Sequence, residues 1–209
     1  MPLQIVRNDI TKMEVDAIVN TTNAEMIGYS GVDYAVHSAA GKEFEEECGR
    51  LAPIAEGTAV VTPGYRLPAK YVIHTCGPVW KGGASHEEEQ LESCYVACLL
   101  KAMELSCETV AFPLISSGAY GYPKDRVLSL AVKIITEFLL DMDKEENDMT
   151  VYLCYLQMGI LFFFLNIFHN YKLKHYSNMV EIVDLQNYLV HILSNNQRVR
   201  SILLISFLL

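Results

Sequence analysis

One segment of the chain reads Phe112-Pro113-Leu114-Ile115-Ser116-Ser117-Gly118-Ala119-Tyr120-Gly121-Tyr122-Pro123. The apolar residues that lead into it, from Thr109 to Phe112, predict a buried strand, and the residues after it are apolar at helical spacing from Val127 to Leu139. Two serines, two glycines and a tyrosine separate the strand from the helix. This composition is typical of a loop whose backbone N–H groups bind an anion at a helix N-terminus, at the carboxyl end of a sheet. An ordinary connection between a strand and a helix is the alternative for this segment taken alone.

The composition indicates one domain with an unusual C-terminal part. The chain has 209 residues, of which 51% are hydrophobic and 20% charged, so it is long enough to bury a sizeable core. Residues 1–154 contain 12 Lys and Arg against 23 Asp and Glu, whereas residues 155–209 contain 4 against 2. Binding of nucleic acid needs Lys and Arg to displace counterions, so an acidic body argues against broad electrostatic binding of nucleic acid. A small phosphorylated ligand stays compatible with this charge, because backbone amides can hold a diphosphate.

The cysteines predict free thiols. The six of them lack paired C-x-x-C spacing, and Met1-Pro2-Leu3-Gln4 has no basic-then-apolar signal sequence. We therefore expect a cytoplasmic protein with reduced cysteines, in which Cys94 and Cys98 lie on the core face of a helix. No set of residues has the spacing of a zinc site, so no metal is predicted.

Strands and helices alternate along residues 1–154. Apolar runs predict strands at 4–7, 17–20, 57–62, 71–75, 109–112 and 149–154, and helical periodicity predicts helices at 31–40, 42–51, 87–105 and 124–142. This order indicates a three-layer α/β domain. The helix over residues 31–40 is expected to turn Val32, Ala35, Val36 and Ala39 inward and to end before Gly41.

A second strand–loop–helix unit lies near the N-terminus. The strand at 17–20 runs into a turn, and Gly28-Tyr29-Ser30-Gly31 then opens the helix, so that Asn20, Asn23 and Asp33 fall in or beside that turn. Asn is a common turn former, and Asp in a first helical turn interacts favourably with the helix dipole. A purely structural role is therefore open for each of these residues. His37, one turn after Asp33, is interpreted as a packing residue.

The C-terminal tail differs in composition from the body. No Asp, Glu, Lys or Arg occurs from Met149 to Tyr171, so by length this segment could span a bilayer. The interpretation that we favour uses residues 149–154 as the last core strand and packs the remainder as a helix. Lys172 and Lys174 support it, because in a spanning topology they would place the acidic domain on the outer side of the membrane. A further helix is expected over residues 179–193.

Several separated motifs together resemble the hydrolase branch of the macro domain family. They are Val19-Asn20-Thr21-Thr22-Asn23, Gly31-Val32-Asp33, Val36-His37-Ser38-Ala39-Ala40-Gly41, Gly57-Thr58-Ala59, Tyr71-Val72-Ile73-His74-Thr75 and Ile115-Ser116-Ser117-Gly118-Ala119-Tyr120-Gly121-Tyr122-Pro123. Their order and spacing match over residues 1–154, which make up a whole domain, and leave residues 155–209 as an atypical hydrophobic segment of unknown role. The resemblance implies a three-layer α/β/α macro-domain fold with a mixed central sheet and a cleft for ADP-ribose at the strand ends.

The resemblance also implies how the cleft holds its ligand. Asp9 would accept a hydrogen bond from the adenine amino group, with the N–H of Ile10 beside it. The loop from Ser116 to Tyr120 would surround the diphosphate, and Val32 would face the diphosphate from the other side. Tyr120 would also contact the distal ribose. The complete set of implied ligand-binding residues is Asp9, Ile10, Asn20, Val32, Ser116, Ser117, Gly118, Ala119, Tyr120 and Gly121.

Asn23 and Asp33, ten positions apart, are implied as the catalytic residues at the distal ribose. A carboxylate can orient or deprotonate a water, and an amide can fix a ribose hydroxyl. The implied reaction is hydrolysis of mono-ADP-ribosyl esters of Glu or Asp, or of O-acetyl-ADP-ribose, with release of ADP-ribose and a carboxylate side chain or acetate. ADP-ribosylated protein or O-acetyl-ADP-ribose is thus the expected partner, and the scheme requires neither a metal nor a cofactor.

Two departures from the family pattern keep other functions open. Tyr29 and Ser30 stand where hydrolytic members commonly have glycines, which adds bulk beside the distal ribose and favours a non-catalytic ADP-ribose reader. After Cys154 the usual polar turn is missing, although Tyr155 could supply the aromatic residue that covers adenine. A replaced C-terminus of this kind would alternatively leave an inactive product.

Overall fold

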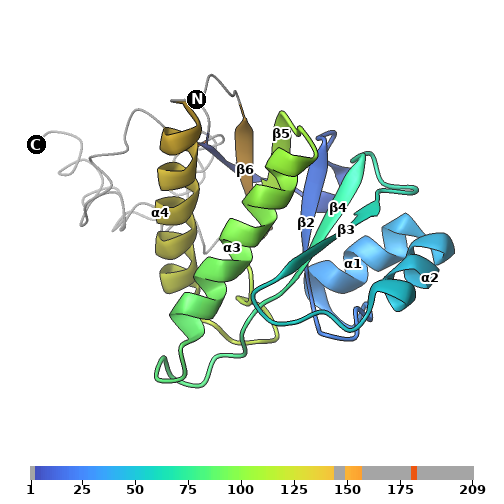
Figure 1. The fold of residues 1–209 in the computed structure, drawn as a ribbon, viewed down its shortest axis with the longest axis horizontal. Coiled ribbons are helices and arrows are strands. Elements are labelled where there is room, and N and C mark those ends of the chain that lie inside the picture. Colours follow the sequence, from blue (N-terminus) through green and yellow to red (C-terminus); the bar gives the residue numbers. More distant parts are fainter. Residues whose placement is uncertain (1–2, 144–148, 157–179, 183–209) are drawn as a thin grey trace, which may run out of the picture.

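The computed structural model describes residues 3–143, 149–156 and 180–182, with helices packed around one central sheet (Figure 1). The strands are β1 (Leu3–Arg7), β2 (Ala17–Thr22), β3 (Ala59–Pro63), β4 (Tyr71–Cys76), β5 (Thr109–Phe112), β6 (Thr150–Tyr155) and β7 (Val180–Ile182). The helices are α1 (Gly31–Ala40), α2 (Lys42–Leu51), α3 (Glu87–Glu104), α4 (Lys124–Asp143) and a short 3₁₀ helix, η1 (Ile10–Lys12). The strands and helices predicted for residues 1–154 are confirmed, with small shifts at their ends.

The sheet is mixed, as the resemblance implied. Its strand order is β3-β4-β2-β5-β6-β1-β7. β3 pairs antiparallel with β4, and the other neighbouring pairs among the described strands are parallel. Because parallel strands end at the same edge of a sheet, the loops that follow β1, β2, β5 and β6 all open on one edge, where α/β folds bind ligands.

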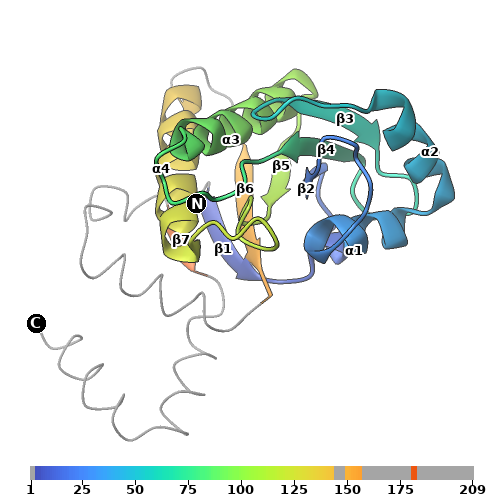
Figure 2. The ribbon, with the colours of Figure 1, turned by 90° about the horizontal axis from the view of Figure 1, so that it is seen from below.

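Helices cover both faces of the sheet, which makes the fold three-layered. Figure 2 shows α3 and α4 over one face and α1 against the opposite face. In β2, Val19 packs in the core beneath α3 and α4, whereas its neighbour Ile18 packs on the side of α1 and α2. Phe112 and Ala111 of β5 alternate in the same way. Burial of both faces explains why these strands are continuous apolar runs in the sequence.

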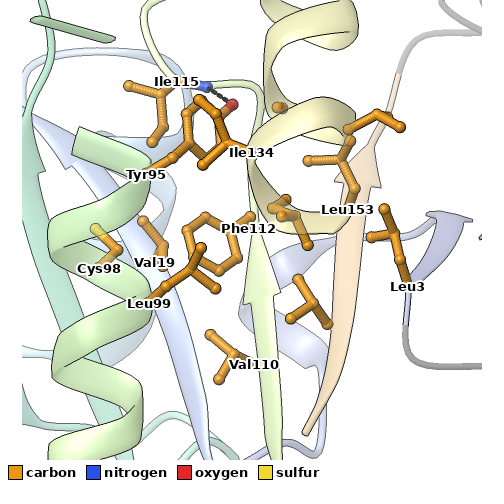
Figure 3. Packing of buried hydrophobic residues seen from close by; sticks show 14 of the residues in the cluster. Leu3, Val19, Tyr95, Cys98, Leu99, Val110, Phe112, Ile115, Ile134 and Leu153 are labelled. Carbon is orange, nitrogen blue, oxygen red and sulfur yellow. Dashed lines mark hydrogen bonds between the residues drawn. The ribbon is translucent and has the colours of Figure 1, made fainter. Parts of the chain in front are cut away.

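The core beneath α3 holds the beginning of the loop that follows β5. Tyr95 of α3 stacks on Phe112 of β5, with ring centroids 5.7 Å apart. The Tyr95 hydroxyl accepts a hydrogen bond from the N–H of Ile115 at 3.2 Å, drawn in Figure 3, and donates one to the carbonyl of Pro113 at 3.4 Å. The residues that enter the loop are therefore fixed by a helix of the neighbouring layer.

Helix α1 turns a more polar face inward than its sequence predicted. The residues expected inward were Val32, Ala35, Val36 and Ala39, but Ala39 is exposed and the buried residues are Asp33, Val36, His37 and Ala40. The physical reason is that the sheet beneath α1 supplies polar partners for Asp33, described below. A rule that places apolar residues inward does not anticipate such partners.

The prediction of a helix over residues 179–193 is wrong at Val180–Ile182. These residues form β7 and pair in parallel with Leu3, Gln4 and Ile5 of β1. The edge of the sheet at β1 offers unpaired backbone groups, and the alternating Val-Glu-Ile pattern suits a strand that pairs with them. The rest of that predicted helix, and the part of the candidate membrane span from residue 157 onward, lie outside the described residues.

Two further expectations concern the cysteines and the membrane. All six cysteines are free and buried, and Cys94 and Cys98 belong to the core beneath α3, as predicted. In the ranges that the structure describes, no helix combines the length and the hydropathy needed to cross a membrane.

Candidate ligand-binding site

A cavity of about 480 Å³ opens at the edge of the sheet where β1, β2, β5 and β6 end. Pockets of roughly 300–1,000 Å³ are typical of small-molecule sites. Its wall includes Asn8, Asp9, Ile10, Thr22, Asn23, Tyr29, Ser30, Val32, Asp33, Ser116, Ser117, Gly118, Ala119, Tyr120, Lys124, Tyr155 and Leu156. The fold thus brings together every predicted site residue except Asn20 and Gly121, which do not line the cavity.

The loop between β5 and α4 has the form of an anion cradle. Ser116 adopts a φ of +61°, a left-handed conformation that is uncommon for residues other than glycine. A hydrogen bond of 3.0 Å from the N–H of Tyr122 to the carbonyl of Ser116 closes the turn. Inside it, the N–H groups of Gly118, Ala119 and Tyr120 have no acceptor among the described residues. Successive N–H groups that are free in this way can bind a phosphate.

The hydroxyl of Ser116 is the second polar feature of this loop. Its Oγ is buried and has no hydrogen-bond partner among the described residues. Gly77 lies directly against it, since a Cβ built on Gly77 would be 2.2 Å from that Oγ. A buried hydroxyl without a partner costs free energy, and Ser116 lines the cavity, so a polar ligand group would remove this cost.

The opposite wall is the N-terminus of α1. Gly31 begins the helix with a φ of +59°, while Ser30 is extended with a φ of −161° and forms no side-chain cap. The first N–H groups of a helix have no partner within the helix and carry its positive dipole end, so they favour an anion. Tyr29 and Ser30 adopt no positive φ, and the Tyr29 side chain is 83% exposed at the cavity wall. The loop therefore accommodates both residues without backbone strain.

Asp33 is a buried carboxylate on the cavity wall. Its Oδ1 accepts a hydrogen bond from Asn20 Nδ2 at 2.8 Å, and its Oδ2 accepts one from Thr22 Oγ1 at 3.0 Å. His37 Nε2 lies 3.6 Å from Oδ1. Burial raises the pKa of Asp33 above its ordinary value, and the hydrogen bonds from Asn20 and Thr22 offset this only in part. With a raised pKa and a place on the cavity wall, the carboxylate is suited to take a proton from water.

Asn23 is held by its own loop. Its Nδ2 donates to the carbonyl of Ile27 at 3.2 Å, and its Oδ1 accepts from the N–H of Ile27 at 3.1 Å. An amide has two hydrogens on nitrogen and two lone pairs on oxygen, so one of each is left for a ligand. Asn23 can therefore contact a ligand in the cavity without leaving its position.

Asp9 and Ile10 form the far end of the cavity. Asp9 caps η1, because its Oδ1 accepts hydrogen bonds from the N–H of Thr11 at 3.1 Å and from the Thr11 hydroxyl at 2.7 Å. The hydroxyl bond of Thr11 is the main reason why the pKa of Asp9 lies below its ordinary value, so the carboxylate stays charged. Leu156, which is 63% exposed, adds apolar surface to the cavity beside Tyr155.

Two predicted site residues, Asn20 and Gly121, lie elsewhere, and several wall residues were not predicted, Thr22 and Leu156 among them. Asn20 is fully buried beneath Asp33, to which it donates a hydrogen bond, rather than at the cavity wall. Thr22 was missed although it is two residues after Asn20 in the same strand, and this spacing places both on one face of the sheet. Leu156 was missed because nothing in its local sequence marks it. Among the described residues, no cluster of His, Cys, Asp or Glu could hold a metal ion.

A family model, curated relatives and solved structures all match this chain, and they agree on the family. The family model described as Macro domain matches residues 19–131. A macro domain-containing protein of Methanosarcina mazei is 50% identical over 73% of this chain and 81% of its own length. An O-acetyl-ADP-ribose deacetylase of Salmonella gallinarum is 45% identical over 66% of this chain and 79% of its own length. The solved structure of the Trypanosoma brucei macrodomain in complex with ADP-ribose superimposes with a TM-score of 0.71 and 30% identity, covering 80% of this chain and 69% of that chain.

Proposed function

This chain belongs to the macro domain family, and on that premise we propose that it binds ADP-ribose in its cavity and hydrolyses esters of ADP-ribose. The two substrate classes in view are O-acetyl-ADP-ribose and proteins that carry mono-ADP-ribose on Glu or Asp. Relatives named O-acetyl-ADP-ribose deacetylases, and solved macrodomains with ADP-ribose bound, support this proposal.

The geometry of the cavity suits the parts of ADP-ribose. The free N–H groups of the loop from Gly118 to Tyr120 and the N-terminus of α1 face one cavity from two sides, which suits a diphosphate. The charged Asp9 and the backbone of Ile10 suit the polar edge of adenine, for which Leu156 offers apolar surface. With the diphosphate and the adenine assigned in this way, the distal ribose is the part of the ligand left for Asn23 and Asp33.

The observation that carries the hydrolytic proposal is the buried Asp33 carboxylate, held by two hydrogen bonds on the cavity wall. In the proposed reaction Asp33 accepts a proton from a water, and the resulting hydroxide adds to the ester carbonyl. The bond between the acyl carbon and the ribose oxygen then breaks, and the ribose oxygen takes the proton from Asp33. The acyl group leaves as a carboxylic acid, which releases its remaining proton to solvent and becomes a carboxylate side chain or acetate. Asn23 orients the ribose hydroxyl next to the ester.

The test is hydrolysis of O-acetyl-ADP-ribose and of a glutamate-linked mono-ADP-ribosylated protein by the purified chain. We expect Asp33→Asn to lower kcat/KM by about 100-fold or more, because general-base catalysis contributes roughly 10²–10⁴-fold. Glu45→Gln is the matched control, since it removes one negative charge at an exposed position of α2 outside the cavity. Calorimetry with ADP-ribose completes the comparison. Tight binding without turnover of either substrate would identify a non-catalytic ADP-ribose reader instead.

A further inference from the structure

A chain of polar side chains runs through the apolar layer between the sheet and the helices α1 and α2. Asn20 of β2 pairs in register with His74 of β4. Asn20 Nδ2 lies 3.3 Å from His74 Nδ1, and His74 Nε2 lies 3.0 Å from the Oγ1 of Thr62 in β3. Through Asn20 the chain ends on Asp33, which alone of these four residues lines the cavity.

The charge on Asp33 fixes the direction of every hydrogen bond in this chain. An ionised carboxylate only accepts, so the Asn20 group that faces it must be the NH₂ group rather than the carbonyl. The second hydrogen of that NH₂ is donated to His74 Nδ1, which must then carry no proton. The neutral imidazole therefore has its proton on Nε2 and donates it to the Thr62 hydroxyl. Burial supports the neutral form, since it lowers the pKa of His74 to about 3.

The orientation of the Asn20 amide depends on this chain alone. The Oδ1 of Asn20 is buried and has no hydrogen-bond partner among the described residues. The two donated bonds, to Asp33 and to His74, are therefore the polar contacts that set the plane of the amide. Without the acceptor on His74, the amide would keep one bond only and could rotate about its side-chain torsions.

Packing does not explain why polar residues occupy these positions. Asn20, His74 and Thr62 are at most 1% exposed, and the Phe44 ring lies 5.3 Å from the imidazole of His74 between centroids. Burying three polar side chains in such a layer is costly, and apolar residues of similar volume would usually fill it at no loss of stability. Their hydrogen bonds converge on one reactive group, which suggests a role at that group.

We infer that His74 and Thr62 are positioning residues, which fix the Asn20 amide and thereby aim the Asp33 carboxylate into the cavity. The inference rests on the proposed function, in which Asp33 is the general base. A base must be held in the geometry of the reaction, and a displacement of about 1 Å can cost about 100-fold in rate. His74 acts at a distance in this arrangement and touches neither the ligand nor the water.

Other titratable groups lie near Asp33 and could affect its titration. His37 of α1 lies 3.6 Å from Asp33. Cys48 of α2 and Tyr120 of the β5–α4 loop also face this region, but burial raises the pKa of Cys48 to about 12 and raises that of Tyr120 as well, so both stay neutral. His74 is neutral as well, because burial lowers its pKa to about 3. Tyr29 and Lys124 share the cavity wall with Asp33. Because the His37 ring lies this close to Asp33, the measurements are repeated in a His37→Gln background.

The experiment compares four variants with the unmodified full chain. His74→Leu removes the acceptor for Asn20, whereas His74→Asn places an amide oxygen near the former Nδ1 and keeps it. Thr62→Val breaks only the far end of the chain. Thr136→Val is the matched control, because Thr136 is equally buried but lies in α4, where its hydroxyl bonds to the Val132 carbonyl. The measurements are kcat and KM against pH, ADP-ribose affinity, thermal stability, and the carboxyl titration of Asp33 by NMR.

We expect His74→Leu to lower kcat by about 10- to 100-fold through misplacement of the base, with the affinity for ADP-ribose unchanged. The acid limb of the kcat profile and the NMR titration of Asp33 should both move to higher pH, because a hydrogen bond to the charged carboxylate is weakened. Thr62→Val should shift both in the same direction by less, and His74→Asn should restore most of the rate. The shift should persist in a His37→Gln background.

Two results would overturn the inference. One is a folded His74→Leu or Thr62→Val protein whose Asp33 titration and kcat match the unmodified chain. The other is a loss of kcat that only follows the loss of thermal stability and is equal in Thr136→Val. If the unmodified chain hydrolyses neither substrate, the proposed hydrolysis fails, and the NMR titration of Asp33 still decides the inference by itself.

Discussion

Among single residues, Gly77 controls the position of the Ser116 hydroxyl. It has room for no side chain, because a Cβ there would lie 2.2 Å from Ser116 Oγ and 2.8 Å from Ile115 Cγ2. Both neighbours belong to the loop that we assign to the diphosphate. Ser116 already has a strained backbone with a φ of +61°, so it has little freedom to retreat.

We therefore predict that Gly77→Ala lowers the affinity for ADP-ribose by about ten-fold or more, since overpacking commonly costs about 1–3 kcal/mol and 1.4 kcal/mol is a factor of ten. Isothermal titration calorimetry measures it. Gly49→Ala is the matched control: it makes the same change in α2, where a Cβ would meet nothing within 4 Å. Equal affinities of the two variants would show that Ser116 tolerates displacement and that the loop does not hold the ligand through it.

At the scale of elements, α3 contributes to the site without lining the cavity. The Tyr95 hydroxyl bonds to both Ile115 and Pro113, so this helix fixes the start of the β5–α4 loop. Removing the hydroxyl leaves a buried N–H and a buried carbonyl without their partner. We predict that Tyr95→Phe lowers the free energy of unfolding by about 1–3 kcal/mol. We also expect a moderate loss of ADP-ribose affinity, of less than about ten-fold, because the loop then has to be ordered on binding.

Chemical denaturation and calorimetry measure these two effects. Tyr71→Phe is the control, because the Tyr71 hydroxyl makes no hydrogen bond within the part of the chain that the structure describes. Should Tyr95→Phe lose stability but bind ADP-ribose as tightly as Tyr71→Phe, α3 would support the core and not the site.

The elements were largely predictable from the sequence because both faces of the sheet are buried. Continuous apolar runs and helical periodicity locate strands such as β5 and helices such as α3 directly. The inward face of α1 was not predictable, because its Asp33 is buried against Asn20 and Thr22 of another element. Such a partnership depends on the strand register between elements that are apart in the sequence.

In the candidate site, too, contacts between elements that are apart in the sequence could not be predicted. Most of the residues predicted from the motifs line one cavity, because loops at one edge of a sheet converge whatever their order in the chain. His74 belonged to one of these motifs, yet its contact with Asn20 follows from the pairing of β2 with β4. Sequence periodicity gives the face of a strand but does not give its neighbours.

At the scale of the whole molecule, β7 joins the C-terminal part of the chain to the sheet. It covers the edge of β1 that would otherwise be open. The cavity lies at the ends of β1, β2, β5 and β6, and its wall residues among those described reach no further than Leu156. The stability that β7 contributes is therefore expected to be separable from ligand binding.

We predict that a chain shortened to residues 1–156 is less stable than one of residues 1–182 but binds ADP-ribose with similar affinity. Only the longer of the two can pair β7 with β1, and each net ladder hydrogen bond contributes about 0.5–1.5 kcal/mol. The open edge of β1 should also make the shorter chain more prone to associate. Thermal unfolding, light scattering and calorimetry on this pair measure stability, association and affinity separately. A shorter chain that is equally stable would mean that β7 does not contribute to the domain, and one that folds but no longer binds would place part of the site beyond Leu156.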